Sequence, residues 1–390
     1  MTRAPRAGYL PTLDGWRAIA ILGVLLDHVV GYSPLRHIPF LFGVTRTGPN
    51  GVSLFFAISG FLICSRLLEE QAALGRISLR GFYIRRICRI LPPAMFYLTV
   101  IGILGVAGVI RVGVAEWLSA VFFFRNYLPE SWISRGWGGY TIHYWSLAVE
   151  EHFYLLWPAA LVLLGKLRAR WFALALALAV AGWRIWEFHA HWLDRLIPGL
   201  LFGSRTDIRL DALLLGCLAA LLLADKSVRA VFVGRFRLWM WALCVAGYVA
   251  LQLIQRVRSY SILESALLPL VVVGTVYHPR TWVGRLLESA PLKWVGRLSY
   301  SLYLWQQLFL VPDPSSKLFL FQRLPLSLVM VVLMAWMSYE FLERPFIRLG
   351  HRLAPPPTDG RDDLAAGAEV ELRDQAKNAE VRTTEAPAAD

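Results

Sequence analysis

The residues of this chain best suited to chemistry begin with Arg17 and His28, at the two ends of the apolar stretch RAIAILGVLLDH. Ten residues separate them, so in an α-helix that rises about 1.5 Å per residue they stand roughly 16 Å apart. If Arg17 marks one membrane face, His28 lies about halfway across the membrane. An ionisable side chain at that depth is costly unless it has a partner, and it indicates a functional site. A histidine bonded to a neighbouring helix for packing is the alternative.

Two adjacent carboxylates lie about two turns into the aromatic segment HYWSLAVEEHFYLLWP. They are Glu150 and Glu151. Neighbouring helical residues point about 100° apart, so at most one of the two can face a given partner. A carboxylate near His28 would orient the imidazole and raise its basicity. A structural ion pair with an arginine such as Arg209 is the alternative.

Three arginines, Arg85, Arg86 and Arg89, cluster within about one helical turn of the segment GFYIRRICRILPP. Arginine offers a planar fork of hydrogen-bond donors, which suits phosphate groups. The sequence has no Walker or Rossmann glycine pattern here, so a nucleotide would have to be held by side chains. An ordinary basic loop that sets topology or touches lipid headgroups is the alternative.

The elements that must position these side chains are membrane helices. The 390 residues are 57% hydrophobic and 17% charged, with 16 Trp and a mean hydropathy of +0.51, which excludes an ordinary soluble globular protein. Repeated apolar stretches of about 18 residues or more predict transmembrane helices. The first stretch carries four ionisable residues and lacks a small-residue cleavage site. We therefore expect a retained helix and not a signal peptide.

We predict an all-α fold, a polytopic membrane helix bundle of about ten transmembrane helices. The predicted spans are about 14–32, 51–68, 94–112, 144–165, 171–188, 207–224, 238–255, 262–278, 296–312 and 325–343. The apolar piece 115–124 is too short to cross, and we expect a re-entrant or interfacial helix there, with an eleventh span as the alternative. In the second span, Ser53, Ser59 and Gly60 favour close helix packing.

The loops between the predicted spans give the orientation. The net charge of +13 could indicate a nucleic-acid partner, but the basic residues fall in these short loops. One alternate set of loops holds about twice as many Lys and Arg as the other. This bias predicts that both termini lie in the cytoplasm, with the bundle in the cell inner membrane.

Composition also divides the chain along its length. Residues 1–353 are expected to form one transmembrane domain, whereas 354–390 are polar and cannot bury enough apolar surface to fold alone. We expect a disordered cytoplasmic tail there. The four cysteines show no CxxC spacing, so we expect neither a disulfide framework nor a metal site.

Further polar residues lie in and beside the later spans. Arg184 and Glu187 are spaced i,i+3 and predict an ion pair. The segment RTDIRLDALLLG carries four charges at the membrane edge, and we expect a network that closes the outer end of the bundle, with acceptor binding as the alternative. In GRLSYSLYLWQQ, Ser299, Ser301 and Gln306 could line a cavity, whereas the tyrosines equally suit the interfacial belt.

Taken together, these segments resemble the membrane acyltransferase 3 family over about residues 9–347. The resemblance rests on the ordered motifs LDGWRAIAILGVLLDH, GVSLFFAISGFLI, FYIRRICRILP, HYWSLAVEEHFYLLWP, RTDIRLDALLLG and GRLSYSLYLWQQ. It implies a polytopic inner-membrane enzyme that moves acetyl or other short acyl groups onto hydroxyls of glycans, lipids or secondary metabolites. It also implies acyl-CoA as a cytoplasmic donor substrate, no permanently bound cofactor, and membrane lipid rather than nucleic acid as a partner.

The same resemblance assigns roles to individual residues. The family's Arg-x10-His motif falls on Arg17 and His28, with His28 as the catalytic histidine. Its Arg-x-x-Arg element falls on Arg86 and Arg89, which would hold the donor's phosphates, and its paired-acid segment begins at Glu150.

Two residues depart from the family pattern. His152 stands where a glutamine is more usual, and Gln306 stands where a histidine is expected, which weakens a catalytic role for the ninth span. We see no appended extracytoplasmic hydrolase-like domain, which some members carry. We therefore expect acyl transfer to finish within the membrane domain or with another protein.

These residues favour direct transfer. His28, helped by Glu150 or Asp27, would remove the proton from an acceptor hydroxyl, which would then attack the thioester. A covalent acyl-histidine is an alternative within the same class. The main rival is a multi-span transporter or acyl-group carrier without chemistry, since ten spans and midplane charges fit that class. A membrane sensor or scaffold is a third reading.

Overall fold

The structure, a computed structural model, describes residues 10–33, 37–38, 47–133, 139–254 and 262–355. Within these ranges the chain is helical and has no strand, which confirms the predicted all-α class. Each of the ten predicted spans overlaps a helix or one arm of a helix, although the number of membrane crossings stays a prediction. Most of the predicted tail, from residue 356 onward, lies outside the described residues.

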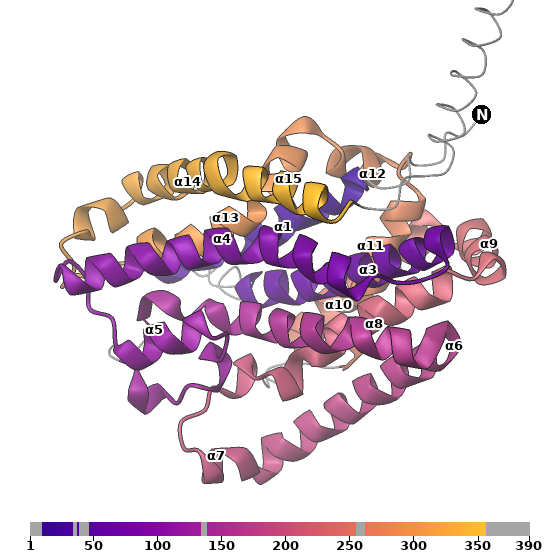
Figure 1. Cartoon of the computed structure of the whole chain (residues 1–390), viewed down its shortest axis with the longest axis horizontal. Helices are drawn as coiled ribbons and strands as arrows, with labels where there is room; N and C mark the ends of the chain where they lie inside the picture. The colour runs from indigo at the N-terminus through magenta and orange to yellow at the C-terminus, as the bar shows by residue number, and fades with distance from the viewer. Residues whose placement is uncertain (1–9, 34–36, 39–46, 134–138, 255–261, 356–390) are drawn as a thin grey trace, which may run out of the picture.

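The helices are named in chain order (Figure 1). The long ones are α1 (Pro11–Gly31), α3 (Thr47–Leu74), α4 (Leu79–Val106), α6 (Tyr144–Ala190), α8 (Thr206–Leu223), α10 (Leu238–Ile254), α11 (Ile262–Tyr277), α13 (Ala290–Leu310) and α14 (Leu326–Ser338). A π-helical turn, η8 (Tyr339–Glu343), joins α14 to α15 (Arg344–Leu353). The short helices are α5 (Val114–Val121), α7 (Trp192–Leu196), α9 (Lys226–Arg235) and α12 (Trp282–Leu287), with 3-10 turns η3 (Arg125–Tyr127), η4 (Glu130–Trp132), η5 (Gly139–Thr141), η6 (Phe202–Ser204) and η7 (Phe319–Gln322).

Helix α6 accounts for two predicted spans. At Gly165 the backbone takes φ 67° and ψ 168°, a conformation that only glycine adopts without strain. The chain turns there, and Figure 1 shows the second arm of α6 running back toward α7. The spans predicted at 144–165 and 171–188 are therefore the two arms of one bent element.

Length and composition support part of the predicted membrane topology. Among the described residues, three helices are long and apolar enough to cross a membrane: Gly48–Leu74, Leu79–Val106 and Leu326–Leu353. A fourth is added if α9 and α10, which meet at an angle of 90°, count as one span. Helix α5, at eight residues, rises only about 12 Å. The short piece at 115–124 is therefore too short to be an eleventh span, as predicted.

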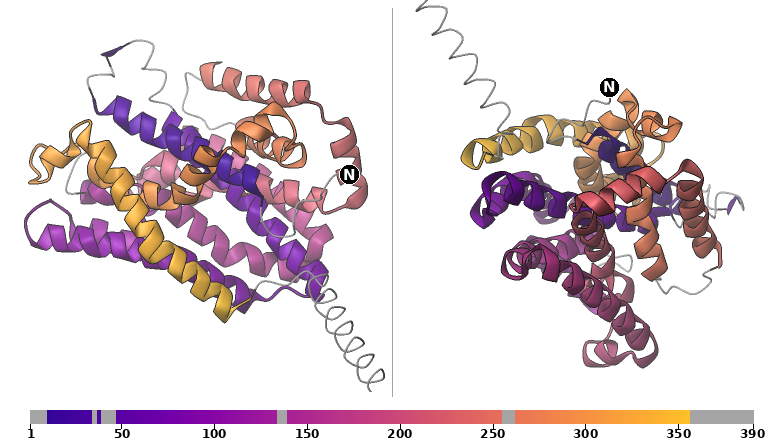
Figure 2. Two further views of the ribbon diagram at one scale, coloured as in Figure 1. Left: turned by 90° about the horizontal axis from the view of Figure 1, so that it is seen from above. Right: turned by 90° about the vertical axis from the view of Figure 1, so that its right-hand side faces the viewer.

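Helix α1 lies at the centre of the packing. It packs against α3 on one side and α13 on the other, while α8 packs against both α3 and α6. The segment from α14 to α15 covers one side of the bundle, where α15 packs along α4 (Figure 2). Helices α9 and α12 lie at one end of the bundle and α5 and α7 at the other (Figure 1). The four predicted loops that hold these short helices therefore lie at the two ends of the bundle.

Two glycines allow the central helices to approach closely. A Cβ atom at Gly60 would overlap the backbone of Leu213, which brings α3 against α8. A Cβ atom at Gly296 would overlap the backbone of Asp14, which brings α13 against the start of α1. The packing role predicted for Gly60 is confirmed. The contact at Gly296 holds the start of α1 against α13, and so it helps to position the side chains that α1 carries.

Candidate active site

Helix α1 carries Arg17 in its second turn and His28 in its last turn. That His28 lies about halfway across the membrane stays a prediction. The helix begins at Pro11, ahead of the predicted start, and it ends at Gly31, three residues after the histidine. Arg17 and His28 therefore lie toward opposite ends of α1, and each lines a different cavity.

The larger cavity, which we call the histidine chamber, has a volume of about 730 Å³. Residues from α1, α3, α13 and the start of α6 surround it. Its polar and aromatic lining consists of Asp27, His28, Tyr32, Glu130, Ser131, His143, Trp145, Tyr303, Gln306 and Gln307. Carboxylates, imidazoles and amides beside aromatic rings suit a ligand that is rich in hydroxyl groups.

Several buried polar atoms of this chamber have no hydrogen-bond partner within the described part of the chain. They are His28 Nδ1, both ring nitrogens of His143, and the Oε1 atoms of Gln306 and Gln307. Buried polar atoms in folded proteins are nearly always paired, because an unpaired one carries its full desolvation cost. Their convergence on one cavity is the feature expected of a binding site.

The smaller cavity, which we call the arginine pocket, has a volume of about 80 Å³. Its polar lining consists of Arg17, Ser59, Arg86, Arg89, Ser146, Glu150, Ser299, Tyr300 and Tyr303. Residues 17, 86, 89 and 150 were singled out in the sequence, and the structure brings all four to this one pocket. Val52 and Tyr303 line both cavities, so the two lie against each other.

The three clustered arginines divide into two groups. The guanidinium carbon of Arg86 lies 3.8 Å above the ring of Tyr154, and its Nε atom has no hydrogen-bond partner among the described residues. Arg85 instead forms an ion pair with Glu70 at 2.8 Å. Arg86 and Arg89 therefore line the pocket, whereas Arg85 is committed to a structural pair.

Glu150 lies in the arginine pocket and not in the histidine chamber. Its Oε1 atom accepts a hydrogen bond from Ser59 Oγ at 2.8 Å, and Arg86 is an electrostatic neighbour. Of the two carboxylates considered as helpers of His28, Asp27 is the one that shares its chamber. Arg209, the alternative partner of Glu150, donates to Ser53 Oγ at 3.1 Å.

Sequence reasoning missed two residues of the site. His143 stands directly before α6, and its only sequence signal was a histidine at the edge of an aromatic segment. Tyr303 equally suited the interfacial belt, but it is buried and lines both cavities. Of the serines expected to line a cavity, Ser299 lines the arginine pocket, whereas Ser301 donates to Glu343 at 3.0 Å.

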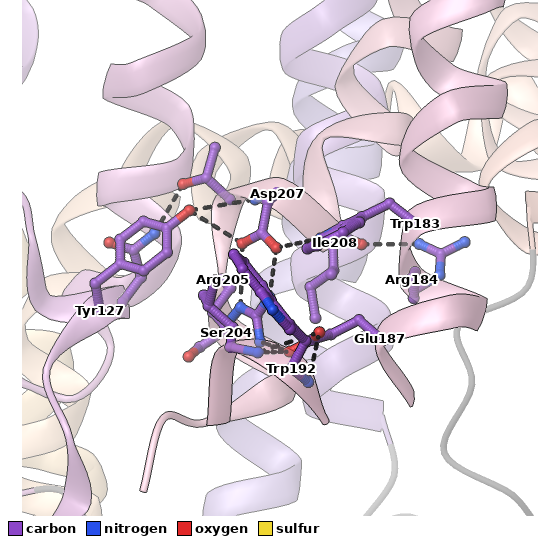
Figure 3. Close-up of polar contacts among 12 residues, drawn as sticks. Tyr127, Trp183, Arg184, Glu187, Trp192, Ser204, Arg205, Asp207 and Ile208 are labelled. Atoms are coloured by element: carbon purple, nitrogen blue, oxygen red, sulfur yellow. Dashed lines mark hydrogen bonds and ion pairs between the residues drawn. The ribbon is translucent and has the colours of Figure 1, made fainter. Parts of the chain in front are cut away.

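The charged network expected near α8 is present (Figure 3). Arg205 forms ion pairs with Glu187 at 2.8 Å and with Asp207 at 2.5 Å. Arg184 pairs with Asp211 at 3.0 Å. The predicted i,i+3 pair between Arg184 and Glu187 is therefore wrong. Each of the two residues reaches a partner beyond the end of α6, because the α8 segment packs against that arm.

Hydrogen bonds join this network to the surrounding loops. Asp207 accepts from Trp183 Nε1 at 2.6 Å and from the Tyr127 hydroxyl at 3.1 Å, and Glu187 accepts from the first backbone N–H groups of α7. Burial and the neighbouring Asp207 carboxylate raise the pKa of Tyr127 to about 12, so its hydroxyl keeps the proton that it donates. We call this cluster the ion-pair network. Its members are Tyr127, Trp183, Arg184, Glu187, Arg205, Asp207 and Asp211.

Comparison with known proteins gives one family. A family model described as an acyltransferase domain matches residues 10–339. The chain is 30% identical over 375 residues to the Staphylococcus aureus (strain COL) protein named "Putative O-acetyltransferase SACOL0978", a match that covers 90% of this chain and 59% of that protein. It is 28% identical over 368 residues to "O-acetyltransferase OatA" of Staphylococcus aureus (strain NCTC 8325 / PS 47), covering 88% of this chain and 58% of OatA.

The chain thus spans about three-fifths of the length of the curated relatives that it matches. No solved structure matches it.

Proposed function

The chain belongs to the membrane acyltransferase 3 family, and from this premise we propose that it is an integral membrane O-acyltransferase. It transfers an acetyl or other short acyl group from acyl-CoA to a hydroxyl of a glycan, a lipid-linked sugar or a metabolite. The observation that best supports this is the pair of adjoining cavities, one lined by arginines and the other by unpartnered imidazole and amide atoms.

Acyl-CoA enters from the arginine side. Arg86 and Arg89, with Arg17 opposite them, hold the negative charge of the donor's phosphates through forked hydrogen bonds. Glu150, bonded to Ser59, keeps the Arg86 side chain oriented toward the pocket. The pocket is much smaller than a CoA molecule, so the phosphates meet the arginines while the pantetheine arm carries the thioester past them toward the histidine chamber. The name of the relative OatA favours acetyl as the acyl group.

The acceptor hydroxyl enters the histidine chamber. His28 takes the proton from this hydroxyl, with Asp27 in the same chamber as its carboxylate helper. The oxygen attacks the thioester carbon, the C–S bond breaks, and the CoA sulfur takes the proton from His28. General-base help of this kind accelerates a reaction by about 10²–10⁴-fold.

The membrane topology is part of the proposal. About ten spans cross the cell inner membrane, with both termini and the arginine pocket toward the cytoplasm. Helices α9 and α12 connect predicted spans in the loop set richer in Lys and Arg, and they lie at the end of the bundle where α1 begins. Acyl-CoA is a cytoplasmic metabolite, so this orientation presents the donor to the arginines.

Thiol release tests the proposed function. Full-length protein in nanodiscs is supplied with acetyl-CoA and a mixed envelope-glycan extract, and His28→Ala is compared with His152→Gln. His152 lies in α6 and bonds Thr206, so its substitution serves as a histidine control outside both cavities. We expect release to fall by about 10²-fold or more in His28→Ala alone.

A second pair of variants tests the donor side. Arg86→Ala/Arg89→Ala should raise the acetyl-CoA concentration needed for half-maximal rate, whereas Arg66→Ala, which removes an exposed ion pair with Glu69, should leave it unchanged. Thiol release that is equal in wild type and His28→Ala would contradict the proposal. It would favour a transporter or an acyl-group carrier.

A further inference from the structure

Tyr303 stands where the two cavities meet. It is one of two residues, with Val52, that line both the arginine pocket and the histidine chamber. Val52 offers only methyl groups at this boundary, whereas Tyr303 offers a hydroxyl. Of the two residues that line both cavities, Tyr303 is thus the one that can hydrogen-bond to an acyl group at their boundary.

Two aromatic side chains, one from the lining of each cavity, hold the ring of Tyr303 in place. The residue is 7% exposed, and its ring centroid lies 5.6 Å from that of His143 and 6.4 Å from that of Phe55. Both contacts are close to edge-on, an arrangement that aromatic pairs favour. The position of the hydroxyl is consequently fixed before any substrate binds.

The hydroxyl of Tyr303 shares its partner with a second hydroxyl. It donates to the backbone carbonyl of His143 at 3.1 Å and lies 2.6 Å from Ser146 Oγ, which reaches the same carbonyl at 3.2 Å. One hydroxyl is enough to keep that carbonyl paired. If Ser146 donates to it, the Tyr303 hydrogen can turn to another acceptor without leaving a buried group unpaired.

We propose that Tyr303 is a catalytic residue, whose hydroxyl donates a hydrogen bond to the oxyanion formed during acyl transfer. This inference rests on the proposed function. As the acceptor oxygen bonds to the thioester carbon, its proton goes to His28 and the carbonyl electron pair moves onto oxygen. The C=O bond then re-forms, the C–S bond breaks, and the CoA sulfur takes the proton from His28. Tyr303 keeps its own proton throughout and only supplies the hydrogen bond.

Removing the hydroxyl is the first test. Full-length Tyr303→Phe in nanodiscs is assayed with acetyl-CoA and a methyl glycoside that the wild type acylates. We expect kcat to fall about 10²-fold, the usual effect of losing one oxyanion donor, with both KM values nearly unchanged. A wild-type kcat in this variant would overturn the inference.

Tyr97→Phe is the matched control. Tyr97 is also buried, but it lines neither cavity, and its hydroxyl donates to the Tyr140 carbonyl at 2.8 Å. We expect its kcat to stay close to that of the wild type. Equal losses in the two variants would overturn the inference, because they would point to a general disturbance of the helix packing.

A second variant tests the shared carbonyl. In Ser146→Ala, Tyr303 is left as the one hydroxyl of the pair, so its hydrogen is held on the His143 carbonyl and kcat should fall. The double variant Tyr303→Phe/Ser146→Ala should then be no slower than Tyr303→Phe alone. Losses that multiply would show independent roles and overturn the inference. Affinity for CoA and the unfolding temperature are measured for every variant, to verify that it is folded.

The two levels of proposal fail in different ways. If thiol release by the wild type does not depend on His28, the proposed function is wrong. If release depends on His28 while Tyr303→Phe retains the wild-type kcat, only the role of Tyr303 is wrong.

Discussion

The ion-pair network and the histidine chamber both bury polar side chains, and they differ in how their hydrogen bonds are completed. In the network, Arg205 meets two carboxylates, and those carboxylates accept further bonds from Trp183, Tyr127 and the start of α7. In the chamber, His28 and His143 present ring nitrogens that have no partner among the described residues. Within the described part of the chain, Arg184 Nε is the one buried atom of these ion-paired side chains without a hydrogen-bond partner, whereas the chamber has five such atoms.

This difference distinguishes polar groups that stabilise the fold from polar groups that are available to bind a ligand. A completed network stabilises one arrangement of its helices, and each member is costly to remove. An incomplete set of polar atoms lowers the stability of the free protein, and its free energy is recovered when a ligand pairs with it. Substitutions in the two regions should therefore have opposite effects on stability and on activity.

The largest stability effect is expected in the network. Arg205→Ala leaves the buried Glu187 and the partly buried Asp207 without their cation, so we expect a loss of about 3–5 kcal/mol in the free energy of unfolding. The control Arg344→Ala removes an exposed pair with Glu340 and should cost less than about 1 kcal/mol. Thermal unfolding in detergent measures both. Similar unfolding temperatures for Arg205→Ala and Arg344→Ala would show that the network stabilises the protein no more than an exposed ion pair does.

A substitution in the chamber should sharpen the comparison. Gln306→Leu removes an unpartnered Oε1 atom, so we expect unfolding free energy to stay constant or rise by up to about 1 kcal/mol. The KM for the acceptor should rise roughly two- to tenfold as one hydrogen bond is lost. Thermal unfolding and acceptor titrations measure the two quantities.

The control for this variant is another buried glutamine, Gln322. Its amide accepts from the Asp313 N–H and donates to the Leu308 carbonyl, both at 2.8 Å. Because both bonds are lost, Gln322→Leu should lower the free energy of unfolding by about 1–3 kcal/mol. If Gln306→Leu is equally destabilising, the chamber is a structural network like the first region.

The smallest loss within the network is expected at its edge, where Tyr127→Phe removes one hydrogen bond to Asp207 and should cost about 1–2 kcal/mol. The pKa of Tyr127 is raised from 10.0 to about 12, so the folded state favours the protonated hydroxyl. The cost should be constant below pH 10 and should shrink between pH 10 and 12. Unfolding temperatures at pH 7, 9 and 11 measure this difference. A cost that changes between pH 7 and 9 would contradict the assignment.

Much of the helical framework and several site residues could be predicted from the sequence. Apolar stretches of membrane length gave the helices, since that signal is local. The spacing of Arg17 and His28, and of Arg86 and Arg89, also depends only on one helix, and these residues do line two adjoining cavities.

Contacts between distant segments could not be predicted in the same way. Arg184 has a carboxylate three residues away, which favoured a local pair, yet its partner Asp211 comes from α8. Tyr303 has the composition signal of an interfacial residue, and only the packing of α13 against α1 and α3 gives it a place between two cavities. His143 carried no spacing signal at all.

Helix α1 has a consequence for how this sequence can change in length. Because Arg17 and His28 line separate cavities on one continuous helix, a single inserted residue between them would rotate His28 by about 100° and advance it by about 1.5 Å relative to Arg17. The histidine would then point into a neighbouring helix while the arginine kept its place. The number of residues between Arg17 and His28 therefore determines whether both side chains reach their cavities, and a change in that number would disrupt the site.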